Sequence, residues 1–144
     1  MSRTDDAVST FRTGYNCSSS ILSAFGGDFG LSREQCLRIG CAFGGGIARQ
    51  GGICGAVSGA LMVLGLKHGQ VNLQDADAKK KTYALAKKLM DAFAARNGSV
   101  NCRDLLGCDI STDEGLKKAM AMNFHTEICP RFVKDAAEIL EGLL

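Results

Sequence analysis

The chain has 144 residues, 46% of them hydrophobic, which is enough to build one substantial core in a single domain spanning residues 1–144. Its 17 basic and 15 acidic residues leave a formal net charge of +2, and no aromatic residues interleave with the basic cluster Lys79–Lys81, so nothing indicates nucleic-acid binding. The most apolar segment, residues 53–66, is too short to cross a bilayer, and no apolar leader opens the chain, so we expect a cytoplasmic protein without membrane insertion.

Glycine divides the first third of the chain into short segments of helical rather than alternating periodicity. The first two segments, residues 5–12 and 17–25, run into glycines, where helices commonly end. Ser32 and Gln35 form a capping-box pattern that opens a third helix. The glycine-rich residues 44–52 lack the Gly-Lys-Ser/Thr ending of a P-loop, so we expect a tight connector there rather than a phosphate site.

A helix over residues 53–67 is predicted to lie at the centre of the fold, because its apolar residues point to every side. Further along, residues 77–96 place Leu85, Leu89 and Phe93 on one face and lysines on the other, which is typical of an amphipathic helix. The sequence therefore predicts an all-α protein, a compact helical bundle around a buried central helix. The predicted helices cover residues 5–12, 17–25, 33–43, 53–67, 77–96, 99–106, 112–124 and 130–143.

Seven cysteines are the most unusual feature of the composition, because a reducing compartment leaves little use for structural disulfides. Four of the seven stand where predicted helices begin. The first-turn N–H groups of a helix are unpaired and the helix dipole is positive there, so we expect a lowered pKa at these four thiols. They are Cys17 and Cys102, each preceded by an asparagine N-cap, Cys54 at the start of the central helix, and Cys129 as the N-cap ahead of Pro130.

The segment Gln50–Ala60, QGGICGAVSGA, surrounds one of these thiols with small residues. Gly55 and Gly59 lie on one face of the predicted helix, so neighbouring helices can approach its backbone closely. Gly51 and Gly52 carry no side chain that would cover the sulfur, which leaves a path for a partner or a small oxidant. An inert buried thiol within close helix packing explains the same segment equally well.

The segment Cys54–Gly59, CGAVSG, resembles the C-G-A-x-x-G motif of a family of putative redox-active proteins named for four spaced cysteines. The resemblance extends over nearly the whole chain and includes residues 14–17 and 101–107. It implies redox chemistry without naming a substrate. The signature cysteines that it marks are Cys17, Cys54, Cys102 and Cys129, and the additional ones are Cys36, Cys41 and Cys108.

Two chemistries compete for the four signature thiols. In the first, a low-pKa thiolate, with Cys54 as first choice, attacks a disulfide or peroxide and another of the four resolves the intermediate, as in a thiol-based oxidoreductase with its own redox partner. In the second, the same sulfurs, with Cys108 as a spare, bind an iron–sulfur cluster or another soft metal, although no C-x-x-C spacing supports the common motifs. A third alternative is a non-catalytic helical interaction protein, and a homo-oligomer is compatible with each.

Two further residues receive less weight than the cysteines. His125 stands four residues before Cys129, a spacing that would place imidazole and thiol on one helical face, but Pro130 predicts a break between them. Arg103 follows a signature cysteine and would help to hold a thiolate, although such an arginine is more often a surface residue.

Overall fold

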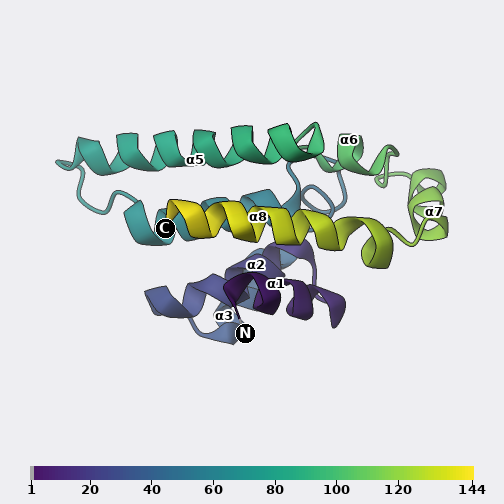
Figure 1. Ribbon diagram of the computed structural model, residues 1–144, viewed down its shortest axis with the longest axis horizontal. Coiled ribbons are helices and arrows are strands. Elements are labelled where there is room, and N and C mark those ends of the chain that lie inside the picture. The colour runs from purple at the N-terminus through teal and green to yellow at the C-terminus, as the bar shows by residue number, and fades with distance from the viewer. Residues whose placement is uncertain (1) are drawn as a thin grey trace.

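The protein consists of helices in three layers in the computed structural model, which describes residues 2–144 (Figure 1). No β-strand occurs within those residues, so the prediction of an all-α fold is confirmed. The helices are α1 (Arg3–Arg12), α2 (Cys17–Phe25), α3 (Arg33–Gly40), α4 (Gly55–His68), α5 (Ala76–Asn97), α6 (Cys102–Leu106), α7 (Asp113–Ala121) and α8 (Cys129–Leu143), with the 3₁₀ turns η1 (Gly26–Phe29) and η2 (Cys41–Phe43) and the π-helical turn η3 (Phe124–Ile128).

The central position predicted for the apolar helix is confirmed by α4. This helix packs against α2 on one side and against α5 and α8 on others, and Figure 1 shows α5 along one side of the molecule and α1 to α3 along the opposite side. Because α4 is surrounded, it has no polar face to turn outward. None of the helices within residues 2–144 combines the length and the apolar character that a membrane span requires. The fully buried side chains of α4 include Ala56, Val57, Ala60, Val63 and Leu64.

Glycines set the closest approaches between helices. A Cβ atom on Gly59 of α4 would lie only 2.9 Å from the carbonyl oxygen of Ser18 in α2. A Cβ atom on Gly40, at the end of α3, would lie 2.6 Å from the backbone nitrogen of Ser19. Any larger residue at these positions would push α2 away from its neighbours, so the close packing predicted around the small residues of α4 is confirmed.

Two helices begin later than predicted, because the residues before them pair with each other. Ile53 and Asn101 form an isolated antiparallel bridge, so the segments that contain them are extended rather than helical. Next to the bridge, the Cys102 N–H donates a hydrogen bond of 2.7 Å to the Gly52 carbonyl. As a result α4 begins at Gly55 and α6 begins at Cys102.

The prediction of a break before Pro130 is wrong. The π-helical turn η3 runs directly into α8, whose first residue is Cys129, and Ile128 rather than Cys129 occupies the N-cap position. Proline is tolerated there because the N–H groups of the first turn have no intrahelical partners. The preceding helix α7 ends at Ala121, earlier than predicted. Asn123, between α7 and η3, takes a left-handed conformation with φ of 52°.

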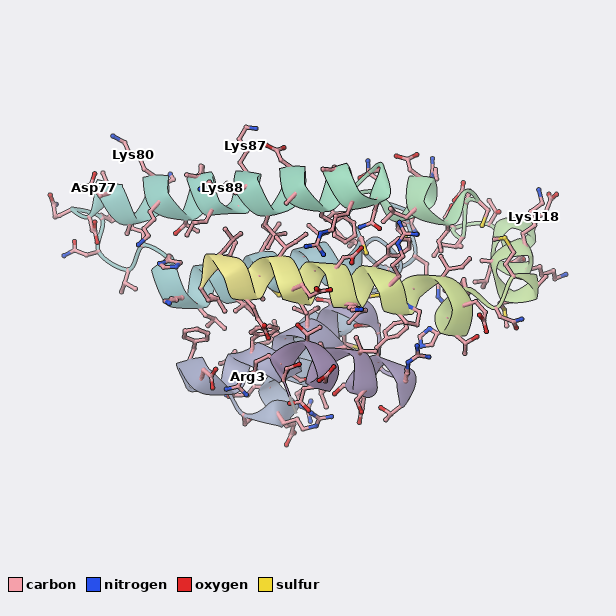
Figure 2. The ribbon with its side chains drawn as sticks, in the orientation of Figure 1. Arg3, Asp77, Lys80, Lys87, Lys88 and Lys118 are labelled. Carbon is pink, nitrogen blue, oxygen red and sulfur yellow. The ribbon has the colours of Figure 1, made fainter. Side chains whose placement is uncertain are left out.

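The amphipathic pattern of α5 matches its place on the surface. Leu89 and Phe93 are buried against the core. Figure 2 shows Lys80 and Lys87 on the far side of α5, pointing away from α4 and α8. Lys87 pairs with Asp91 one turn further along at 2.6 Å. The basic cluster of α5 is therefore part of a solvated helix face.

Candidate functional site

The four signature cysteines lie on the wall of one cavity of about 510 Å³. Each belongs to a helix start: three are the first residues of α2, α6 and α8, and the fourth immediately precedes α4. The structure thus brings together thiols that are far apart in the sequence. Cys41, from the turn η2, lies on the same wall, whereas Cys36 and Cys108 do not. The five wall cysteines are Cys17, Cys41, Cys54, Cys102 and Cys129.

Asn16 joins two of these cysteines through its side chain. Its carboxamide oxygen accepts a hydrogen bond of 2.9 Å from the Ser19 N–H, which caps α2 as the sequence predicts. Its amide nitrogen donates to the backbone carbonyl of Cys41 at 2.8 Å. The start of α2, with Cys17, is therefore fixed relative to η2, with Cys41.

The bridge between the extended segments joins two more thiols. The Cys54 N–H donates to the Val100 carbonyl at 2.8 Å, and the Cys102 N–H donates to the Gly52 carbonyl at 2.7 Å. The start of α4 and the start of α6 are therefore held side by side by backbone hydrogen bonds. The expected side-chain cap by Asn101 is absent: its side chain makes no capping hydrogen bond to α6.

The surroundings of Cys54 favour its thiolate form. A hydrogen bond with the Cys17 side chain lowers the pKa of Cys54 most, and burial opposes this effect. The backbone N–H groups of Ala56 and Val57 also lower the pKa of this thiol. They belong to the first turn of α4, so the effect predicted for a thiol at a helix start is confirmed for Cys54.

Cys17 and Cys102 show the opposite shift, and for them the expected lowering of the pKa is wrong. Hydrogen bonds with Cys129 and with Cys54, followed by burial, raise the pKa of Cys17 well above its usual value. Burial, followed by the electrostatic effect of neighbouring cysteines, Cys54 first among them, raises the pKa of Cys102 to about 12. Because α6 is only Cys102–Leu106, its small dipole does not offset the desolvation of the thiol.

Access to these sulfurs differs between the thiols. Cys54, Cys102 and Cys129 are almost completely buried, with exposed fractions of 4%, 8% and 7%. Cys17 is half-buried, and Cys41 is exposed to solvent. All seven cysteines are free thiols. Among the wall cysteines, Cys41 is therefore the one most open to a molecule in solution.

A run of left-handed backbone spans residues 45–49, at the edge of the cavity. Besides two glycines it contains Ile47, Ala48 and Arg49, with φ of 67°, 50° and 62°. Left-handed backbone costs about 1–2 kcal/mol for each non-glycine residue, and a β-branched residue such as Ile47 is rare there. The run is held by hydrogen bonds such as that from the Ala48 N–H to the Ala42 carbonyl, 2.8 Å long. Strain of this kind is commonly found beside functional sites.

The two residues given less weight in the sequence, His125 and Arg103, differ in whether they line the cavity. His125 lies on the cavity wall and stacks on Phe11, with ring centroids 4.2 Å apart. Its Nε2 atom is buried and has no hydrogen-bond partner. Arg103 lies outside the cavity wall, where it pairs with Asp109 at 3.4 Å. Only the histidine is therefore placed to contact a molecule in the cavity.

The cysteine sulfurs form a soft donor set, of the kind that binds zinc, copper(I) or iron–sulfur clusters. Within residues 2–144, however, no three side chains of the types His, Cys, Asp and Glu have the arrangement of metal ligands. The neighbours of Cys17 that most affect its ionisation are two other cysteines, Cys129 and Cys54.

Fold and cavity together define a helical protein with a cluster of thiols at converging helix starts. Over residues 15–143 the chain matches the family described as "Putative redox-active protein (C_GCAxxG_C_C)". Since the match covers nearly the whole chain, the protein belongs to this family. The family description names redox activity but no substrate, metal or cluster. Neither the curated proteins nor the solved structures contain a match to the chain.

The family description also contains a motif that draws attention to Cys41, which the sequence analysis did not single out. It gives one motif as G-C-A-x-x-G, and this string occurs letter for letter at Gly40–Gly45, GCAFGG. The segment Cys54–Gly59 carries the same residues with cysteine before glycine. The two cysteines of these segments, Cys41 and Cys54, both lie on the cavity wall. In the sequence Cys41 falls inside the predicted helix 33–43, away from any helix start, so only the structure shows it on the cavity wall.

Proposed function

We propose that the protein carries out thiol–disulfide exchange, with Cys54 as the attacking thiolate and Cys17 as the resolving thiol. One observation carries the proposal: Cys17 and Cys54 line the same cavity, where α4 and α2 pack so closely that a Cβ atom on Gly55 would lie 3.1 Å from the Cβ of Cys17. The pKa values of the two thiols are also shifted in opposite directions. A lowered pKa raises the share of the nucleophilic thiolate at a given pH, and an adjacent neutral thiol supplies the partner that completes a disulfide.

The exchange proceeds in two balanced steps. The Cys54 thiolate attacks one sulfur of a disulfide, R–S–S–R′, so that a mixed disulfide forms and R′–S⁻ leaves and takes up a proton. Cys17 then loses its proton and attacks the Cys54 sulfur, which forms the Cys17–Cys54 disulfide and releases R–S⁻, protonated by solvent. Two electrons pass from the protein to the substrate. A dithiol reductant returns the protein to its starting state.

The change at Cys54 in the first step also prepares the second. The pKa of Cys17 is raised by hydrogen bonds with Cys129 and Cys54, then by burial, and also by the charge on Cys54. Once Cys54 is in a mixed disulfide, its negative charge is gone, so Cys17 ionises more easily. Cys17 thus stays protonated until it is needed. Cys129, as its other hydrogen-bond partner, is positioned to exchange with the new disulfide.

Thiol counting tests the proposal. The reduced protein is treated with oxidised glutathione, and intact mass and thiol number are followed over time. We expect a transient mixed disulfide at Cys54 and then the loss of two thiols, both reversed by dithiothreitol. The matched control is Cys36→Ala, since Cys36 is a fully buried cysteine outside the cavity, and this variant should react like the native protein. A reversible loss of two thiols in Cys54→Ala, beyond a mixed disulfide at the exposed Cys41, would contradict the assignment.

The same preparation distinguishes the alternative functions. Five cysteines on one cavity wall are the observation that favours a carrier of a soft metal or an iron–sulfur cluster. For that function, protein purified without oxygen would contain stoichiometric iron, zinc or copper, and the metal would protect the thiols from alkylation. If the thiols bind no metal and do not react with disulfides, the remaining function is the third alternative, a non-catalytic helical interaction protein.

A further inference from the structure

The cavity is larger than an inorganic oxidant such as peroxide requires. Its volume of about 510 Å³ falls within the range of about 300–1,000 Å³ that is typical of pockets for small organic molecules. Much of its wall is apolar, including Leu105, Leu106, Ile110 and Phe132. The space next to the thiols thus suits a molecule of several tens of atoms at most, with apolar as well as polar parts.

Apart from the proposed Cys54 thiolate, the charge on the cavity wall is of one sign. Within residues 2–144, Arg49 is the only lining residue with a permanent charge, and no aspartate or glutamate lies on the wall. Arg49 is exposed, and within residues 2–144 it makes no ion pair. An unpaired guanidinium at the edge of a cavity attracts carboxylates and phosphates and offers them paired hydrogen bonds.

The backbone keeps Arg49 at this edge despite an unfavourable conformation. The left-handed run at residues 45–49 is closed by the Gly51 N–H, which donates to the Gly45 carbonyl at 3.1 Å, and by the Gly52 N–H, which donates to the Gly46 carbonyl at 2.9 Å. The run leads directly into the segment that holds Cys54. The cationic group and the proposed nucleophile are therefore fixed by one continuous stretch of backbone.

A second polar group on the wall lacks a partner. His125 lines the cavity, and its Nε2 atom is buried without a hydrogen bond. A buried polar atom of this kind is normally satisfied by protein, water or ligand. Since protein atoms cover this nitrogen, His125 contributes its ring to the cavity wall and carries no part of the proposal below.

We propose that the cavity binds a low-molecular-weight disulfide that carries a carboxylate, with the carboxylate on Arg49 and the disulfide presented to Cys54. This proposal rests on the thiol–disulfide exchange proposed above and names the substrate class of the same site. The bond that forms is Cys54 Sγ to substrate sulfur, and the bond that breaks is the disulfide of the substrate, as in the two steps already given.

Three disulfides of different charge test the substrate class in the native protein. Oxidised glutathione is anionic, bis(2-hydroxyethyl) disulfide is neutral and cystamine is cationic at pH 7. We expect the rate of mixed-disulfide formation to be highest for oxidised glutathione and lowest for cystamine, with a difference that shrinks at high salt. Equal rates for all three would overturn the substrate class and leave thiol exchange standing. Failure of all three to react would overturn thiol exchange itself.

An arginine variant tests the contact. Arg49→Gln should slow the reaction with oxidised glutathione by about fivefold, the upper range for an exposed ion pair, and leave the neutral disulfide unchanged. The control is Lys80→Gln, which removes the same charge from the solvent side of α5, where Figure 2 shows Lys80 directed away from the rest of the molecule. This control should react like the native protein. An equal loss in both variants, or no loss in Arg49→Gln, would overturn the role of Arg49.

Discussion

The two ends of the central helix α4 meet very different surroundings. At its start, α2, α6 and α8 also begin, and their thiols share the cavity wall. At its other end, Lys67 hydrogen-bonds to the terminal carbonyl of Leu144 beyond α8, and the following loop exposes Val71 and Leu73, 99% and 88% accessible. Figure 1 shows the chain end beside this end of α4. Converging helix starts favour negative charge, and that is the end where the thiols lie.

The glycines of α4 also differ between its two ends, in how closely other residues pack against them. A Cβ atom on Gly55 would lie 3.1 Å from the Cβ of Cys17, and one on Gly59 would meet Ser18. A Cβ atom on Gly65 would contact nothing within 4 Å. Close packing is therefore a requirement at the thiol end of the helix only. The comparison shows that the lack of side chains in α4 serves the approach of α2, and with it the contact between Cys17 and Cys54.

The largest expected effect is on the rate of disulfide exchange, which should fall only for a substitution at the thiol end of α4. Cys54→Ala should slow exchange with oxidised glutathione by about 100-fold or more, since the raised pKa of Cys17 and of Cys102 leaves those neighbours largely protonated. Val71→Ser, in the exposed loop at the opposite end, should leave the rate unchanged. The measurement is the rate of mixed-disulfide formation by mass spectrometry. A loss of similar size in both variants would show that the ends are not functionally distinct.

Next in size is the cost of filling the space at the thiol end. Gly59→Ala should destabilise the protein by about 1–3 kcal/mol, because the added methyl group meets the Ser18 backbone and the Ile21 side chain. The free energy of unfolding is measured by urea denaturation. Exchange should slow as well, since α2 carries Cys17 and would be displaced. An unchanged urea midpoint would mean that α2 and α4 are not packed as closely as the structure shows.

A smaller effect concerns the ionisation of the proposed nucleophile. Cys17→Ala removes the hydrogen bond that lowers the pKa of Cys54 most, so that pKa should rise. The sign follows from the charged form: with less support for the thiolate, a higher pH is needed to reach the same ionised fraction. The rate of alkylation of Cys54 by iodoacetamide, plotted against pH, should shift to higher pH. A shift to lower pH would rule out the proposed hydrogen bond.

The smallest effect is expected at the other end of the helix. Gly65→Ala should stabilise the protein by about 0.5–1 kcal/mol, because alanine is the better helix former and the added methyl group meets nothing. The same urea measurement applies, and the exchange rate should not change. Destabilisation comparable to that of Gly59→Ala would remove the contrast between the two ends.

Much of the fold followed from the sequence because its signals are local. The capping box of Ser32 and Gln35, the asparagine cap at Asn16 and the uniformly apolar α4 each depend on residues close together in the chain. The late starts of α4 and α6 could not be read in this way, because the bridge between Ile53 and Asn101 joins segments far apart in sequence. The continuity of η3 into α8 was missed because Pro130 is tolerated in a first turn.

By itself the sequence determined which thiols stand at helix starts, since caps and glycines mark those positions locally. Only the tertiary structure decided how each thiol ionises. Cys54 and Cys102 both open helices, yet hydrogen bonds from Cys17 and the first turn of α4 lower the pKa of the one, and burial raises that of the other. The physical reason is that a helix start places a thiol beside unpaired N–H groups through local residues alone, whereas desolvation and neighbouring sulfurs depend on what packs against it.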